Sequence, residues 1–222
     1  MIRLNAATVE RLPRYFQILR ALRARGREYV SSEHLARLLK VDPSLVRKDL
    51  AWMDSGLQKV GYHVASTLEK IEGVLGMHNT KEAFLVGAGS LGRALMGYRG
   101  FSEYGLKILA AFDIDEWKVG GTVGGIEVLP MSKFADLVRR LNVRIGIVTV
   151  PAEAAQAVAD EMVTAGVVAI WNFAPVTLDV PDNVVVRNEN LAAGFALLSY
   201  ELERALNIRR SETASGDDGI EN

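Results

Sequence analysis

Residues 84–97 read Phe84-Leu-Val-Gly-Ala-Gly-Ser-Leu-Gly-Arg-Ala-Leu-Met-Gly97. The apolar run Ala83–Val86 predicts a buried strand, the glycines that follow have the spacing G-x-G-x-x-G, and an apolar helical face comes after them. This order of strand, glycine turn and helix is typical of a loop that binds the pyrophosphate of a dinucleotide. Gly87 permits the tight turn, Gly89 lets backbone amides approach a phosphate, and Gly92 lets the helix pack close to the strand. The helix N-terminus adds free N–H groups and a positive dipole end.

The next predicted strand, Leu106–Phe112, ends in Asp113, which lies 21 residues after Gly92. An acid at about this distance hydrogen-bonds the adenosine ribose, and its charge repels a 2′-phosphate, so the pattern favours NAD(H) over NADP(H). A strand-turn-helix without a ligand is the alternative. The predicted nucleotide site comprises Gly87, Ala88, Gly89, Ser90, Leu91, Gly92 and Asp113.

Strands and helices alternate beyond Asp113, which predicts an α/β fold with a Rossmann-like parallel sheet whose ligand lies at the carboxyl ends of the strands. We expect strands at 126–129, 143–150, 167–171 and 184–186, and helices at 131–141 and 152–165. The carboxyl ends of two of these strands carry Val150-Pro151 and the run from Asn172 to Pro175. We expect the nicotinamide there, near Val150, Pro151 and Phe173.

The composition indicates a globular protein with an uneven distribution of charge. Of the 222 residues, 49% are hydrophobic, which suits one or two domains with a real core. Cysteine is absent, so disulfides, cysteine metal sites and thiol switches are excluded. Residues 1–64 contain 12 Lys and Arg against 6 Asp and Glu, whereas residues 65–222 contain 14 against 21. A basic segment joined to an acidic one suggests that the first binds a polyanion, although an ordinary solvated surface would look similar.

The basic segment contains the pattern of a helix-turn-helix. Helical periodicity predicts a first helix over 8–25, with its regular part beginning at Pro13, and a second over 30–39 capped by Ser31 or Ser32. After a tight turn, Asp42 and Pro43 predict the start of a third helix that runs from 44 to 53. Its exposed face would carry Ser44, Arg47 and Lys48, which can reach bases or phosphates in a major groove of double-stranded DNA. A three-helix packing module is the alternative.

The residues that follow predict a wing, a linker helix and a terminal helix. Two glycines bracket a short extended piece over 56–64, and we expect Lys59 and Tyr62 to face phosphate or the minor groove. A linker helix is predicted over 65–77. The last helix, 191–209, has a wide apolar surface that either closes the sheet or packs into a partner subunit. The expected domains are 1–79 for DNA binding, 80–190 for the nucleotide, 191–210 for the C-terminal helix and 211–222 for a disordered tail.

The residues favour a ligand-controlled DNA binder over a dehydrogenase. The three histidines all precede the nucleotide motif, no Tyr-x-x-x-Lys pair is present, and there is no room for a separate substrate domain. We therefore expect no enzyme activity, and keep a small oxidoreductase as the less favoured alternative. No apolar run of 18 residues and no signal pattern occurs, so we expect a cytoplasmic protein without a membrane partner. We expect no metal partner either.

Nearly the whole chain resembles the Rex family of bacterial redox-sensing transcriptional repressors. The pieces that match, in order, are Val30-Ser-Ser-Glu-His-Leu-Ala36, Val46-Arg-Lys-Asp-Leu50, Val60-Gly-Tyr62, Val86-Gly-Ala-Gly-Ser-Leu-Gly-Arg-Ala94, Ala111-Phe-Asp-Ile-Asp115, Val150-Pro-Ala-Glu153 and Asn172-Phe-Ala-Pro-Val176. The resemblance implies a homodimer with winged-helix heads, NAD(H)-binding bodies and an exchanged C-terminal helix. It also implies that NADH releases the repressor from its operator.

Three departures from the family pattern bear on sensing. The wing, Ser55-Gly-Leu-Gln-Lys-Val-Gly-Tyr62, has one basic residue where two are usual. The family's aromatic-Gly before it is replaced by Trp52-Met-Asp54, and the stretch between Leu50 and Val60 is about one residue shorter. The family's Asn-x-Asp-Leu motif is Asn188-Glu-Asn-Leu191 here, so an aspartate is replaced by Asn190. The resemblance implies that this position pairs across the dimer with Tyr98 to distinguish the two ligand states. A paralogue with lost or altered redox discrimination is therefore the alternative.

Overall fold

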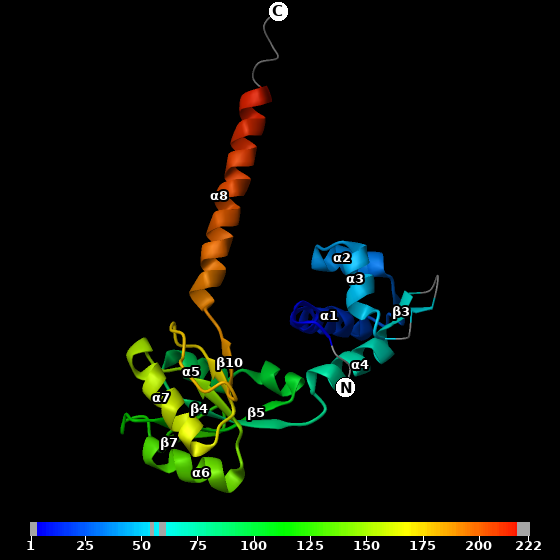
Figure 1. The fold of residues 1–222 in the computed structure, drawn as a ribbon. Coiled ribbons are helices and arrows are strands. Elements are labelled where there is room, and N and C mark those ends of the chain that lie inside the picture. The colour runs from blue at the N-terminus through cyan, green and yellow to red at the C-terminus, as the bar shows by residue number, and fades with distance from the viewer. Residues whose placement is uncertain (1–3, 54–55, 58–60, 217–222) are drawn as a thin grey trace, which may run out of the picture. The chain divides into compact units, whose positions relative to one another are not determined.

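The chain forms two compact units in a computed structural model that describes residues 4–53, 56–57 and 61–216 (Figure 1). Unit 1 contains residues 1–80 and also the short segment 102–105, whereas unit 2 contains 81–101 and 106–222. The boundary between the units follows Thr80, and the domain limits that we predicted stay a prediction. The return of residues 102–105 to unit 1 was not predicted.

Unit 1 contains four helices and a small antiparallel sheet among its described residues. Its elements are α1 (Ala6–Ala24), β1 (Tyr29–Val30), α2 (Ser32–Leu39), α3 (Pro43–Leu50), β2 (Gly56–Leu57), β3 (Gly61–His63) and α4 (Val64–Leu75). The strand order is β1-β3-β2. Asp42 caps α3 by accepting the N–H of Ser44, and Lys40 adopts the left-handed conformation that closes the turn after α2. The helix-turn-helix and the hairpin that follows it are therefore a winged helix.

The largest differences from the predicted helix limits in unit 1 are at the start of α1 and at the end of α3. The regular part of α1 begins at Ala6 rather than at Pro13, because the Asn5 side chain caps the helix by accepting the N–H of Thr8. The helix accommodates Pro13 in its interior. The third helix ends at Leu50 rather than at Met53, yet Met53 still packs in the core of unit 1. Lys59, predicted at the tip of the wing, lies outside the described residues.

A buried carboxylate holds the third helix against the first. Asp49 of α3 is 1% exposed and accepts hydrogen bonds from the hydroxyls of Thr8 and Tyr15 and two from the guanidinium of Arg11. Burial acts to raise the pKa of Asp49, but the hydrogen bonds from Arg11, Thr8 and Tyr15 outweigh it and hold the pKa below its usual value. The network fixes the orientation of α3, whose opposite face carries Arg47.

Unit 2 is built on a seven-stranded sheet of Rossmann type. Its elements are β4 (Lys81–Val86), α5 (Ser90–Met96), η1 (Arg99–Tyr104, whose end lies in unit 1), β5 (Leu106–Asp113), β6 (Thr122–Val123), β7 (Ile126–Pro130), η2 (Met131–Lys133), α6 (Phe134–Leu141), β8 (Ile145–Val148), α7 (Ala152–Ala165), β9 (Ala169–Asn172), β10 (Val185–Asn188) and α8 (Leu191–Gly216). The strand order is β10-β9-β8-β4-β5-β7-β6, and every pair is parallel except β6 with β7. The order reverses between β4 and β8, which is the point where such sheets bind ligands.

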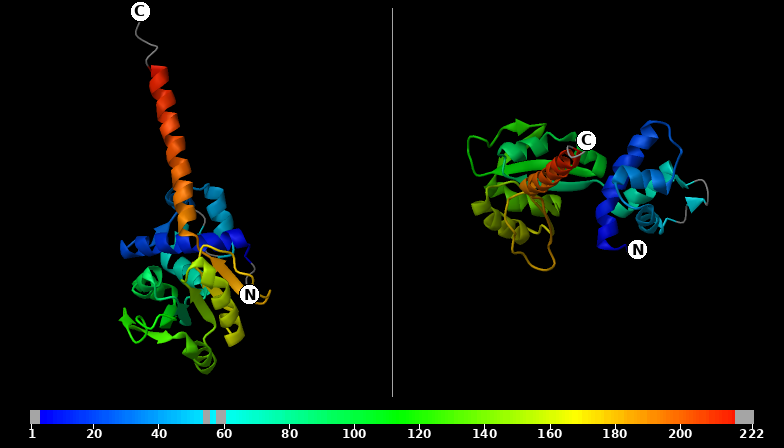
Figure 2. Two further views of the ribbon diagram at one scale, coloured as in Figure 1. Left: turned by 90° about the vertical axis from the view of Figure 1, so that its left-hand side faces the viewer. Right: turned by 90° about the horizontal axis from the view of Figure 1, so that it is seen from above.

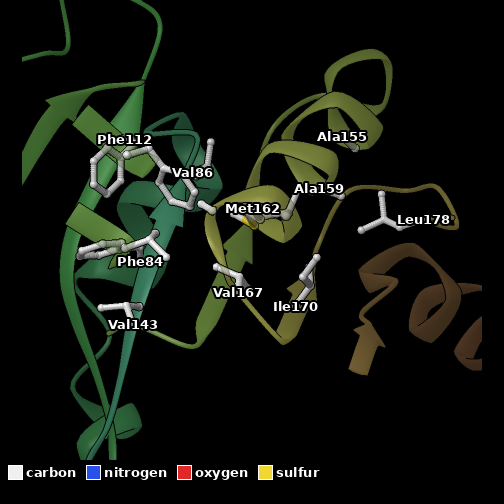
Figure 3. Close-up of a cluster of buried hydrophobic side chains, with 14 of the residues drawn as sticks. Phe84, Val86, Phe112, Val143, Ala155, Ala159, Met162, Val167, Ile170 and Leu178 are labelled. Carbon is white, nitrogen blue, oxygen red and sulfur yellow. The ribbon is translucent and has the colours of Figure 1, made fainter. Parts of the chain in front are cut away.

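Alternate residues of β4 face two separate cores. Phe84 and Val86 pack with α6 and α7, where Phe134 and Met162 are fully buried (Figure 3). Ala83 and Leu85 point to the other face, which is covered by α5 through Met96. This alternation explains why the strand is apolar at every position from Ala83 to Val86: both faces of a parallel sheet are covered there. The core aromatic rings of Phe84, Phe112 and Phe134 meet edge to face or tilted.

The terminal helix α8 is one continuous helix (Figure 2). Its large apolar side chains between residues 191 and 206 are exposed. It runs to Gly216, past residue 211 where we expected a disordered tail to begin, because Ser211–Gly216 contains no proline and each added residue extends a helix that has already formed. Residues 217–222 lie outside the described part of the chain. Within that part, no helix combines the length and apolar character needed to cross a membrane.

Replacement of Asp49 by asparagine should lower the free energy of unfolding by about 3 kcal/mol at pH 7, since it leaves the Arg11 guanidinium without its anion. Because the folded pKa of Asp49 is depressed, its stabilisation is present above the unfolded value near 3.8 and is lost as the pH falls through the folded pKa. Urea unfolding of wild type and variant should therefore converge in acid. Asp136→Asn, which removes an exposed ion pair with Arg140, is the control and should cost less than about 1 kcal/mol.

Candidate functional site

The glycine loop lies where the strand order reverses. It leaves β4 at Gly87, whose N–H donates to the Phe112 carbonyl of β5, while the N–H of Thr149 after β8 donates to the Val86 carbonyl. Gly87 has φ +103°, a conformation that favours glycine. The loop is therefore tied to the strands on both sides of β4.

The three glycines of the loop have three different environments. A Cβ at Gly87 would lie 2.7 Å from the Thr149 carbonyl oxygen, so the turn has no room for a side chain. A Cβ at Gly92 would collide with the Gly87 carbonyl oxygen, because α5 packs directly on the turn. A Cβ at Gly89 would meet no atom within 4 Å. Gly89 thus faces open space, which is what the approach of a phosphate to the backbone requires.

Thr149 was not predicted, and it fastens the loop from the β8 side. Its hydroxyl lies 2.7 Å from the Gly87 carbonyl oxygen and 3.0 Å from that of Val86. The one feature of the sequence that could have indicated this role is its position directly after β8 and before Val150-Pro151. The contact joins residues more than sixty positions apart, which periodicity cannot reveal.

Asp113 ends β5 inside the site, and its carboxylate already has several hydrogen-bond partners. One oxygen accepts the N–H of Ala88 at 2.8 Å and the ammonium of Lys118 at 3.1 Å, and the other accepts the N–H of Asp115 at 2.9 Å. Burial acts to raise the pKa of Asp113, but these donors outweigh it and hold the pKa below its usual value. Asp113 is therefore an anion at neutral pH that shapes the glycine loop and still borders the cavity.

A cavity of about 590 Å³ opens beside the loop, a size usual for a small-molecule site. It is mostly apolar, and α7 forms one of its walls. The lining residues are Val86, Gly87, Gly89, Asp113, Ile114, Asp115, Lys118, Met131, Thr149, Val150, Pro151, Ala154, Ala157, Val158 and Glu161. An apolar slot beside an acid and a glycine loop can hold a planar base, a ribose and a phosphate in turn.

The structure brings most of the predicted nucleotide residues together. Val150 and Pro151 line the cavity with Gly87, Gly89 and Asp113. Ser90, Leu91 and Gly92 form the first turn of α5, and Ala88 supplies the N–H to Asp113. Phe173 does not line the cavity and packs instead on Trp171 at a ring-centroid distance of 4.8 Å. The cavity residues on α7, together with Lys118, were missed.

The two predicted switch residues lie in separate surroundings within one chain. Tyr98 is 58% exposed and meets Phe101 edge to face. Asn190 caps α8, because its side-chain oxygen accepts the N–H of Ala193 at 3.1 Å. The expected pairing across a dimer stays a prediction.

The predicted DNA-binding residues share the exposed face of α3. Ser44, Arg47 and Lys48 are all exposed, and Arg47 makes a 3.5 Å ion pair with Glu33 of α2. A pair this exposed is weak, so a phosphate can replace Glu33 as the partner of Arg47. Tyr62 is half-buried in β3, paired with Gly56 of β2 and Val30 of β1.

Comparisons with known proteins agree on both units. A family model described as "CoA binding domain" matches residues 78–176, and one described as "Putative DNA-binding protein N-terminus" matches residues 4–51. The chain is 44% identical to the redox-sensing transcriptional repressor Rex of Carboxydothermus hydrogenoformans, over 89% of this chain and 96% of that one. It is 40% identical to the Rex repressor of Bacteroides fragilis, over 88% and 89% of the two chains.

Solved structures give the same result. The structure of RSP in complex with beta-NADH superposes with a TM-score of 0.86 at 31% identity, covering 95% of this chain and 99% of that one. The structure of RSP in complex with beta-NAD+ and operator DNA gives a TM-score of 0.85 at 32% identity, covering 96% and 99%.

A matched pair of glycine variants tests the geometry of the loop. Gly92→Ala should lower the free energy of unfolding by about 1–3 kcal/mol, because its methyl group would collide with the Gly87 carbonyl. Gly89→Ala, which enters open space at φ −76°, should change it by less than about 1 kcal/mol. Urea unfolding of both variants measures the difference. Equal losses would contradict the close packing of α5 on the turn.

Proposed function

The chain belongs to the Rex family of redox-sensing transcriptional repressors, and we propose that it is a DNA-binding repressor whose operator affinity is set by the NADH/NAD+ ratio, with NADH releasing the DNA. One observation carries the proposal: a winged helix with an exposed basic face and a Rossmann cavity with a glycine loop occur in one chain. Neither unit alone would connect a metabolite to a promoter.

The cavity supports NAD(H) as the ligand. Gly89 leaves the backbone open to the pyrophosphate, and the Asp113 carboxylate borders the place of the adenosine ribose. Asp113 and Asp115 carry more charge than Lys118 neutralises, so the 2′-phosphate of NADP(H) would be repelled. Val150 and Pro151, on the opposite wall, support the placement of the nicotinamide half towards the end of β8.

The cavity is poorly equipped for redox catalysis, which favours a sensor over a small oxidoreductase. Among the described residues that line it there is no histidine or tyrosine, and the titratable side chains are three carboxylates and one lysine: Asp113, Asp115, Glu161 and Lys118. Its one lysine, Lys118, is bound to two carboxylates, and this raises the pKa of its ammonium further above neutrality. NADH bound here would be read by its shape and charge, and would not be consumed.

The terminal helix supports a homodimer in which α8 is exchanged between subunits. The helix leaves its large apolar side chains exposed, and they include Leu191, Phe195, Leu197, Leu198, Tyr200 and Leu202. Phe195 is 72% exposed. So much apolar surface on one helix needs a covering partner, and a second copy offers a complementary one by symmetry.

The direct test is a titration of DNA binding with each nucleotide. A duplex selected from a random-sequence library by the purified protein would be used, with affinity measured in NAD+ and in NADH. We expect weaker binding in NADH, and no effect of either nucleotide on Gly89→Ala, whose methyl group occupies the phosphate approach. Equal affinities in NAD+ and NADH for the wild type would indicate instead a paralogue that has lost redox discrimination, a reading that the neutral Asn190 favours.

Arg47→Ala should weaken operator binding by about 1–3 kcal/mol, because it removes a cation from the face of α3 that enters the groove. Arg140→Ala on α6 removes an exposed arginine of unit 2 and should leave operator affinity unchanged. Fluorescence anisotropy at several salt concentrations measures both. A loss of NADH affinity in Arg47→Ala would show that the residue is structural.

Phe195→Glu should convert the dimer to a monomer, since the charge would have to be buried against the partner. Glu201→Gln, an exposed change on the same helix, should leave the dimer intact. Sedimentation velocity distinguishes the two masses. A dimeric Phe195→Glu protein would exclude this face of α8 from the interface.

A further inference from the structure

Residues 102–105 leave the nucleotide-binding unit, pack within the DNA-binding unit and return (the crossing segment below). The residues before the crossing segment belong to α5 and the first part of η1, and those after it belong to β5. The helix α5 begins at the glycine loop, and β5 ends at Asp113. The helix that follows the glycine loop and the strand that ends at Asp113 are therefore both joined covalently to one four-residue segment of unit 1.

The crossing segment is held on α1 by side chains. The guanidinium of Arg20 donates to both carboxylate oxygens of Glu103, one of them at 3.1 Å. Gln17 donates to the hydroxyl of Tyr104 at 3.1 Å, and the ring of Tyr104 meets that of Phe16 edge to face at 5.4 Å. The pairing with Arg20 holds the pKa of Glu103 below its usual value, so both partners are charged at neutral pH.

The last residue of the crossing segment, Gly105, lies close to the backbone that follows α4. Gly105 has φ +72°, and a Cβ there would lie 2.8 Å from the carbonyl oxygen of Met77 and 3.2 Å from that of Asn79. Only glycine fits this approach to the chain after α4. The crossing segment is thus held on α1 through Tyr104 and also meets the turn after α4 through Gly105.

Immediately before the crossing segment the chain is anchored in unit 2. Phe101 packs edge to face on Tyr98 at 4.9 Å and on Trp171 of β9 at 5.4 Å. Glu103 follows two residues later, which allows at most about 7 Å of extended chain between the two anchors. Only two residues of chain therefore separate the ring contacts of Phe101 in unit 2 from the ion pair of Glu103 with α1.

We propose that the crossing segment couples the nucleotide site to the DNA-binding unit. The Arg20–Glu103 ion pair and the contacts of Tyr104 with α1 would transmit a change in the position of α5 and β5 to α1. The inference rests on the proposed function, since it names how the NADH response reaches the winged helix. The helix α1 bears Arg11, which holds the Asp49 carboxylate of α3. A displacement of α1 would thereby move α3, the helix that carries Arg47.

In this coupling, the Arg20–Glu103 ion pair contributes more to the transmission between the two units than to the stability of the fold. The side chains of Arg20 and Glu103 are 43% and 47% exposed, and ion pairs of this exposure contribute little to folding. Loss of the pair should therefore leave each unit folded and each ligand bound. What should change is the ratio of operator dissociation constants with and without saturating NADH.

The test compares the ratio of operator dissociation constants in three proteins: the wild type, the single variant Glu103→Gln, and a double variant that exchanges the two charges (Arg20→Glu together with Glu103→Arg). We expect Glu103→Gln to reduce the ratio by about two- to fivefold, the range of an exposed ion pair, and the charge exchange to restore most of it. The NADH dissociation constant measured without DNA should stay within about twofold in every variant. Asp136→Asn, which breaks the exposed Asp136–Arg140 pair on α6, is the matched control and should keep the wild-type ratio.

Two results would overturn the coupling. One is an unchanged ratio in Glu103→Gln while the wild type responds to NADH. The other is a uniform loss of operator affinity with and without NADH, which would mean that the pair is structural. A wild-type ratio of one would instead overturn the proposed function, and the coupling with it.

Discussion

The close packing of backbone at the reversal of the strand order is the constraint on which the site depends. Gly87 lies against Thr149, and Gly92 lies against Gly87, so neither position can carry a side chain. The hydroxyl of Thr149 and the carboxylate of Asp113 then hold the loop from two neighbouring strands. With the loop fixed in this way, the open side of Gly89 is presented to a ligand without further ordering, which lowers the cost of binding.

The sequence predicted features that depend on neighbouring residues and missed those that depend on distant ones. Asp42 and Pro43 predict the start of α3 because a helix cap depends only on residues next to each other in the chain. The glycine spacing depends on neighbouring residues in the same way. The burial of Asp49 was missed, since an acid in a basic helix is usually solvated and its partners lie on α1. Thr149 and the crossing segment were missed for the same reason: their contacts join residues from about sixty to more than eighty positions apart.

The contacts made by α1 within unit 1 differ in burial, and this difference suits the proposed switch. A buried, fully bonded carboxylate keeps α3 rigid on α1, whereas the contacts of the crossing segment with α1 are exposed and weak. Rigid units that are joined by a short segment with weak contacts can change between two arrangements with a small change in free energy. The uncharged Asn190 caps α8 as an aspartate would, so this replacement keeps the cap at the start of the helix.

The central claim is that nucleotide and DNA binding are coupled in one molecule, and calorimetry with NADH tests it most directly. Linkage requires the operator to weaken NADH binding by the same factor by which NADH weakens operator binding. The dissociation constant of NADH should therefore rise by that factor when saturating operator duplex is present. An NADH dissociation constant that is identical with and without the duplex would contradict the account.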